Sequence, residues 1–166
     1  GSGEKRHELV AAMEELGGDR VWVGGFLPRQ RFARLLTQID IGLVTLEDGC
    51  AGLMSPSKIH AYLAAGRPLL YLGPPASNVD EAIERYGCGV RAGYNDAGAL
   101  AAALAKLAGP PSDYARMSAG AVRAAAERHT EAAAGAAFGR LLAELPPAGA
   151  VRGVKRPSPA PARTTG

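Results

Sequence analysis

One segment decides the fold of this chain: SPSKIHAYLAAGRPLLYL, residues 55–72, predicts a short helix followed directly by a strand. Ser55 can cap the helix, and Pro56 suits its first position, where the missing N–H would be unpaired anyway. Gly66 can adopt the left-handed conformation that ends a helix, and Pro68 prevents continuation. The four apolar residues after Pro68 predict a buried strand.

The same segment suggests a phosphate site. A glycine-containing loop, residues 48–54, precedes the helix and follows an apolar strand. Free N–H groups and the positive end of the helix dipole would face an anion there, and Lys58 adds a full charge. The alternative is that Lys58 is a solvated lysine beside a well-capped helix, and this segment alone leaves both interpretations open.

Apolar periodicity predicts strands alternating with helices along the chain. The expected helices are residues 4–16, 28–38, 77–86, 97–108, 112–129 and 130–145, and the expected strands are 21–23, 41–46, 69–72 and 88–92. Residues 41–46 are almost continuously apolar, which is typical of a strand buried on both faces of a parallel sheet. We therefore predict an α/β fold with a parallel sheet, helices on both of its faces, and further helices at the C-terminus.

Local signals define several helix faces and ends. Phe32, Leu35 and Leu36 are expected to point inward from their helix. Ser77 and Asp80 form a capping-box-like pair, with Val79, Ile83 and Tyr86 on the inner face and Gly87 as the stop. Asn95 or Asp96 is expected to cap the following helix, and Thr130 the last one.

Composition points to one globular domain, residues 1–145, and a disordered tail, residues 146–166, rich in Pro, Ala and Arg. The net charge of +3 belongs to the tail: without its four basic residues, 15 basic and 16 acidic residues remain. A nucleic-acid-binding face is therefore not expected. No apolar run reaches transmembrane length, and two cysteines are too few for a disulfide framework, so a cytoplasmic, reduced protein is the default.

Three loops leave the expected carboxyl ends of strands, at residues 24–27, 47–54 and 73–76, and ligands bind at such ends in parallel sheets. Other candidates for chemistry have plainer interpretations. We expect His7 and His129 to be surface residues, His60 to be structural although it lies near the phosphate site, and Cys50 not to be a nucleophile. Arg67 is expected to complement the helix dipole or pair with an acid.

These motifs together resemble the family-4 (group 1) glycosyltransferases. Residues 55–73 look like their "PSK…LAAGRP" segment, especially in the subgroup similar to bacterial cell-surface aminosugar transferases. VWVGGFLP, residues 21–28, resembles their "V-x-F-x-G-x-x-P" strand and loop, and GSGE, residues 1–4, their "G-x-G" turn. NVDEAIERYGCGV, residues 78–90, resembles a further downstream motif. The match is collinear from Gly1 to Ala108.

The resemblance implies the GT-B architecture, in which two Rossmann-like domains enclose a cleft. This chain matches only the C-terminal, donor-binding domain, and that domain normally begins with two strands and a helix that have no counterpart here. The resemblance therefore implies a fragment that starts inside the domain, lacks the N-terminal acceptor domain and has open sheet edges that lower its stability.

The resemblance also assigns site residues. It places at the donor nucleotide and its diphosphate the residues Gly25, Phe26, Leu27, Gly52, Leu53, Met54, Ser55, Ser57 and Lys58. It assigns no catalytic residue and no metal. It also assigns no cofactor, because the nucleotide sugar is itself the substrate. Many members carry two glutamates eight residues apart, and Leu53 and Ala61 stand in those places here. Recognition of the ribose by a carboxylate is therefore in doubt.

The expected function is donor binding in an enzyme that moves a sugar from a nucleoside diphosphate to an acceptor hydroxyl. The resemblance implies retention at the anomeric carbon and a role in cell-surface polysaccharide or glycoconjugate synthesis, with membrane-peripheral association of the full enzyme a further option. The isolated chain is expected to be inactive. The alternative is a non-catalytic nucleotide-binding or interaction module, and a dehydrogenase is disfavoured because no G-x-G-x-x-G motif follows a strand.

Overall fold

A computed structural model describes residues 6–15, 21–50 and 52–144 of the chain. The chain divides into two compact units, residues 1–129 and 130–166, which are considered separately. The expected turn at residues 1–4, both ends of the first helix and the tail lie outside the described residues. The single domain expected over residues 1–145 stays a prediction.

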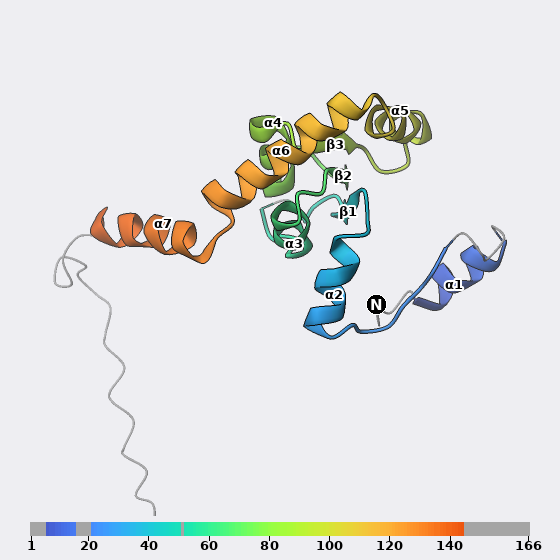
Figure 1. The fold of residues 1–166 in the computed structure, drawn as a ribbon, viewed down its shortest axis with the longest axis horizontal. Helices are drawn as coiled ribbons and strands as arrows, with labels where there is room; N and C mark the ends of the chain where they lie inside the picture. The colour runs from blue at the N-terminus through green and yellow to red at the C-terminus, as the bar shows by residue number, and fades with distance from the viewer. Residues whose placement is uncertain (1–5, 16–20, 51, 145–166) are drawn as a thin grey trace, which may run out of the picture. The chain divides into compact units, whose positions relative to one another are not determined.

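The first unit is built on a small parallel sheet (Figure 1). Its strands are β1 (Gly42–Thr45), β2 (Leu69–Leu72) and β3 (Gly89–Ala92), in the order β1-β2-β3. Gly42 is in register with Leu69, and Leu69 with Gly89. The helices between the strands are α3 (Lys58–Ala64) and α4 (Asn78–Tyr86). The helices α1 (Arg6–Glu15) and α2 (Arg29–Leu36) precede the sheet, and α5 (Ala97–Leu107) and α6 (Pro111–Arg128) follow it.

Helices cover both faces of this sheet, which confirms the predicted α/β class. One face packs against α3, α4 and α6, through Ile59, Leu63, Val79, Ala121 and others around the fully buried Tyr71. The other face packs mainly against α5, through Leu107 and Ala103, with Met117 of α6 completing that layer. Figure 1 shows α5 beside β3, and among the described residues no helix covers the far face of β1.

The uncovered face explains one wrong prediction. β1 is buried on one face only, because Val44 and Leu46 enter the core whereas Leu43 is 49% exposed. The continuous apolar run was expected to be buried on both faces. Similarly, only Leu36 of the three inward residues expected on α2 is buried, and Phe32 is exposed.

The strand expected at residues 21–23 is also wrong, because the structure gives this segment no strand or helix. A strand needs a neighbour for its N–H and C=O groups, and the described sheet pairs β1 with β2 alone. Trp22 is accordingly 72% exposed.

The helix ends follow their sequence signals more closely. Ser77 Oγ accepts a hydrogen bond of 3.1 Å from the Asp80 N–H, and Gly87 ends α4 with φ of +61°. Asp96, not Asn95, caps α5 by accepting a 2.8 Å bond from the Ala99 N–H. In the second unit, Thr130 caps α7 (Glu131–Glu144) through the N–H of Ala133 at 3.1 Å. These predictions are confirmed.

Candidate functional site

A cleft opens at the carboxyl end of β1. It is lined by residues 43–46, at the end of β1 and just beyond it, and by residues 54–58, which lead into α3, and its volume is about 390 Å³. Four of the nine predicted donor-site residues line it: Met54, Ser55, Ser57 and Lys58. The structure therefore brings together the part of the predicted site that comes from the segment around Ser55.

The other predicted site residues do not line this cleft. Gly52 and Leu53 lie in the preceding loop, and Leu53 is 83% exposed. Gly25, Phe26 and Leu27 belong to the segment without regular structure, in which Phe26 is 93% exposed. Their predicted contact with a nucleobase stays a prediction.

The loop before α3 is shaped by two left-handed glycines. Gly49 has φ of +87° and Gly52 has φ of +78°, conformations that residues with a Cβ rarely adopt. Between them, the Cys50 carbonyl oxygen accepts bonds from the N–H groups of Leu53 and Met54, at 3.1 and 3.0 Å. The loop therefore turns tightly before it delivers Ser55 to the cleft.

The start of α3 differs from the sequence prediction. Ser55 was expected to cap the helix, but the helix begins at Lys58 with Ser57 as its N-cap residue. The Ile59 and His60 N–H groups donate to the carbonyl oxygens of Pro56 and Ser57, each at 3.3 Å, so they are not free for a ligand. The polar side chains of residues 54–58 that line the cleft are Ser55, Ser57 and the exposed Lys58.

Ser55 instead connects two neighbouring loops. Its Oγ accepts a 2.8 Å hydrogen bond from Nδ2 of Asn78, the first residue of α4. The sequence prediction missed Asn78, because only the parallel pairing of β1 with β2 places the loops at their carboxyl ends side by side. Asn78 also lines a second pocket.

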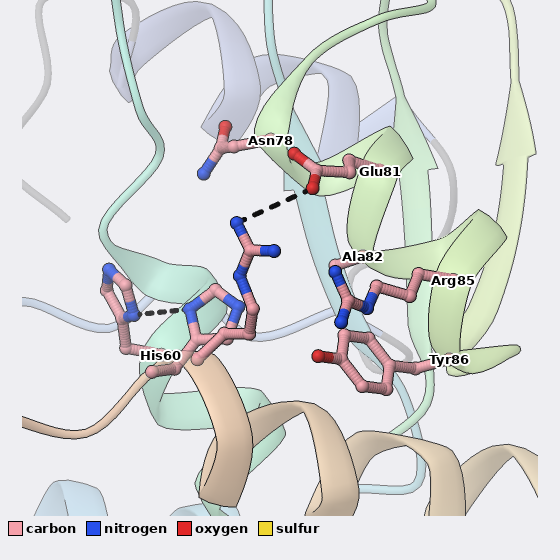
Figure 2. Close-up of a pocket in the computed structure, with 8 residues that line it drawn as sticks. His60, Asn78, Glu81, Ala82, Arg85 and Tyr86 are labelled. Carbon is pink, nitrogen blue, oxygen red and sulfur yellow. Dashed lines mark hydrogen bonds and ion pairs between the residues drawn. The ribbon is translucent and has the colours of Figure 1, made fainter. Parts of the chain in front are cut away.

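This second pocket lies between α3, α4 and the C-terminal end of α6, with a volume of about 190 Å³. Figure 2 shows Glu81 and Arg85 extending from α4 into the space that separates this helix from His60. His60 and His129 meet there, with their Nδ1 atoms 2.9 Å apart and their ring centroids 4.9 Å apart. Both histidines were expected to have surface or structural roles, and nothing in their spacing indicated that they would pair.

Charged groups surround the histidine pair. Arg128 and Glu81 form an ion pair of 3.6 Å (Figure 2). Arg85 lies over the Tyr86 ring, 5.4 Å from its centroid. Burial is the main cause that lowers the pKa of His129, followed by the nearby His60 ring and the charge of Arg128, whereas Glu81 raises it.

The lowered pKa of His129 predicts a loss of stability in acid. The folded chain binds this proton less readily than the unfolded chain, so stability is full above the ordinary histidine pKa of about 6.5 and falls below it. We expect His129→Gln to flatten the fall in unfolding free energy between pH ~7 and ~5, measured by urea titration. His7→Gln, which removes an exposed histidine on α1, is the control, and equal slopes in all three chains would contradict the prediction.

Arg67 has structural partners, and Cys88 lies in the core. Arg67 donates from Nε to the Leu36 carbonyl oxygen at 2.9 Å and from Nη2 to that of Thr37 at 3.0 Å, which joins α2 to the end of α3. Arg67 therefore has a structural role, but its partners are carbonyl oxygens at the end of α2 and the Tyr114 hydroxyl at 3.4 Å, and neither an acid nor the end of its own helix. Cys88 is fully buried, and burial raises the pKa of its thiol to about 11.

Two kinds of feature are absent from the described residues. They hold no group of three or more histidine, cysteine or acidic side chains arranged to bind a metal. Among the described helices, none has both the length and the apolar character needed to cross a membrane.

Comparisons with known proteins indicate a relation to glycosyltransferases. No protein-family profile matches the chain, and no solved structure matches it. A stretch of 66 residues, 40% of the chain, is 38% identical to a protein of Pseudomonas aeruginosa described as a probable glycosyltransferase, WbjE. This stretch covers 16% of that relative's length. The similarity therefore relates a part of this chain to a small part of a protein with that description.

Proposed function

We propose that this chain is the donor-binding part of a glycosyltransferase of the GT-B class, family 4. In the whole enzyme a sugar would pass from a nucleoside diphosphate to an acceptor hydroxyl with retention, in the synthesis of a cell-surface polysaccharide or glycoconjugate. The chain would supply the site for the nucleotide sugar, and an N-terminal domain would bind the acceptor.

One observation carries this proposal: the cleft at the carboxyl end of β1 is lined by both Ser57 and Lys58. In parallel α/β sheets, ligands bind at this edge. A volume of about 390 Å³ lies within the range of small-molecule sites. The similarity to a probable glycosyltransferase supports the choice of a nucleotide sugar among the possible ligands.

The chemical task of these side chains is to stabilise the departing diphosphate. Cleavage of the bond between sugar and phosphate leaves negative charge on the phosphate oxygens, and a cation placed beside them lowers the energy of that state. Lys58 would provide the charge, and the hydroxyls of Ser55 and Ser57 would donate hydrogen bonds. For Ser55 this is compatible with its present role as an acceptor, since its own proton is free to point elsewhere.

A second candidate is a non-catalytic nucleotide-binding or interaction module. It is favoured by the residues at the positions of the two glutamates, because neither Leu53 nor Ala61 can bind a hydroxyl through a carboxylate. Leu53 is also 83% exposed and lies outside the cleft. Such a module would bind the nucleotide but take no part in transfer.

Calorimetric titration of the 166-residue chain with UDP, GDP and ADP tests donor binding. We expect saturable binding of one nucleotide, weakened about 10- to 100-fold in Lys58→Ala, because a hydrogen bond to a charged group is lost. Lys106→Ala removes an exposed lysine on α5 and is the matched control. If no nucleotide binds, or if both variants lose binding equally, the donor site is not at this cleft.

Turnover separates the two candidates. The isolated chain is expected to release no sugar from a nucleotide sugar above background, because the acceptor domain lies outside it. Activity of the isolated chain would show that acceptor binding needs no second domain. Nucleotide binding without transfer, even when an acceptor domain is supplied in the same polypeptide, would favour the non-catalytic module.

A further inference from the structure

The pocket between α3, α4 and the end of α6 gathers cationic and hydrogen-bonding groups that the donor cleft does not use. Its lining contains two arginines, two histidines, an asparagine amide, a tyrosine and one carboxylate. The elements that supply them are far apart in sequence, since His60 and His129 are separated by 69 residues. These side chains therefore come together only in the folded unit and do not form a local sequence motif.

The positive charge of this pocket is only partly neutralised. Glu81 is its one carboxylate, and it approaches Arg128 at 3.6 Å with both side chains about half exposed, at 60% and 49%. Within the described residues Arg85 has no ion-pair partner, and its guanidinium lies over the Tyr86 ring. Glu127 of α6, which precedes Arg128, accepts a 3.1 Å hydrogen bond from the Tyr86 hydroxyl and does not line the pocket. With both histidines neutral, the lining keeps one net positive charge.

The histidine pair can adjust this charge. With its Nδ1 atoms 2.9 Å apart, one ring must donate and the other accept, which requires that one Nδ1 carry no proton. When both rings are protonated, two N–H groups face each other and the hydrogen bond is lost. An oxygen atom with lone pairs placed between the rings would accept from both, so protonation and anion binding favour each other.

The size of the pocket limits the ligand. The volume of about 190 Å³ lies below the roughly 300–1,000 Å³ that is usual for pockets enclosing a whole small-molecule ligand. That is room for a single tetrahedral oxyanion and a little solvent. A nucleoside diphosphate is too large to enter whole, although a terminal phosphate could be inserted.

We propose that this pocket is a second anion site, distinct from the donor cleft, that binds a dianionic tetrahedral oxyanion of the phosphate class. Arg85 and Arg128 provide the fixed charges, and the His60–His129 pair provides two further donors when the anion is present. Binding is coupled to proton uptake by the pair, so the site fills more readily in mild acid. Glu81 opposes the anion and is displaced from Arg128 as it binds.

Histidine NMR of the 166-residue chain tests the proposal directly, because the chain contains only three histidines. Sulfate is the probe, since its charge stays constant across the range in which phosphate gains a proton. We expect sulfate to shift the ring resonances of His60 and His129 in a saturable way and to raise the pKa of His129, which burial lowers in the free chain. His7, exposed on α1, is the internal control and should not respond. Apparent affinity should be about tenfold higher at pH ~6 than at pH ~8.

Variants identify the ligands of the anion. Arg85→Gln and His129→Gln should each weaken sulfate binding at least several-fold, whereas Arg116→Gln, which removes an exposed arginine elsewhere on α6, should not. Circular dichroism reports whether each variant is folded. If His129→Gln does not fold, the result for Arg85→Gln alone tests the proposal, because the Arg85 side chain is exposed and lies outside the core. Equal responses of all three histidines, no response to sulfate, or equal loss in Arg85→Gln and Arg116→Gln would overturn the proposal.

The Lys58→Ala variant distinguishes the donor site from the second anion site. Lys58→Ala should weaken nucleotide binding, as predicted for the donor cleft, and leave the sulfate response of His60 and His129 intact. Loss of the sulfate response in this variant would show that the two sites are one. Titration with inorganic phosphate and with UDP distinguishes the source of the anion. A response to phosphate alone identifies a free anion, and a response to UDP that survives Lys58→Ala identifies an inserted terminal phosphate. No response to either phosphate-class ligand would overturn the assignment of ligand class.

Discussion

Replacing Asp80 with alanine is expected to lower the free energy of unfolding by about 2–3 kcal/mol. Asp80 is 4% exposed and lies in the first turn of α4. Its Oδ2 accepts a 2.9 Å hydrogen bond from the Ala76 N–H, and its Oδ1 pairs with Arg91 Nε at 2.9 Å. The carboxylate therefore holds the loop after β2, the start of α4 and the strand β3 together, and the substitution loses all of these contacts.

Asp113 provides a matched control for this prediction. It also lies in the first turn of a helix, α6, and also meets an arginine, Arg116, at 2.9 Å, but its side chain is 40% exposed against 6% for Asp80. Exposed ion pairs of this kind contribute about 0–1 kcal/mol. Urea unfolding followed by circular dichroism should therefore show a much larger loss for Asp80→Ala than for Asp113→Ala. Equal losses would mean that burial does not determine the strength of the Asp80 contacts.

The fold was predictable where local signals and tertiary packing agree. The cap of α4 by Ser77, its end at Gly87 and the buried strand β2 each follow from a few neighbouring residues. Prediction failed where the outcome depends on distant partners. The apolar residues 21–23 have strand character, but no described strand pairs with them, and Leu43 is apolar but lies on a face of β1 that α5 does not reach.

The candidate site was predictable to a similar degree. Met54, Ser55, Ser57 and Lys58 come from one short segment, so their joint position in the cleft follows from the strand, loop and helix around them. Asn78 was missed because its contact with Ser55 spans 23 residues and depends on two strands lying side by side. The pairing of His60 with His129 was missed for the same reason, because it needs α6 to cross α3.

Gly120→Ala is expected to destabilise the first unit by about 1–3 kcal/mol, although alanine is the better helix former by about 1 kcal/mol. Gly120 lies inside α6, where a Cβ would stand 2.3 Å from the Tyr86 carbonyl oxygen and 3.3 Å from the Cys88 backbone nitrogen. Both contacts are backbone atoms at the end of α4 and the start of β3, so no side chain can rotate away. The helix itself must shift, and the shift opens the core around Ala121 and Ala124.

Gly98→Ala on α5 is the matched control, because its Cβ would meet only Asp96 Oδ1 at an ordinary 3.5 Å. That variant should be neutral or slightly stabilised. Cys88 reports the opening of the core: its thiol is fully buried and its pKa is raised to about 11, so it reacts with thiol reagents only when the structure opens. In a Cys50→Ser background, Gly120→Ala should accelerate labelling of Cys88 about 10- to 100-fold relative to Gly98→Ala. Unchanged labelling would mean that α6 can move away from Tyr86 without loosening the core, and the close approach at Gly120 would then not be required for stability.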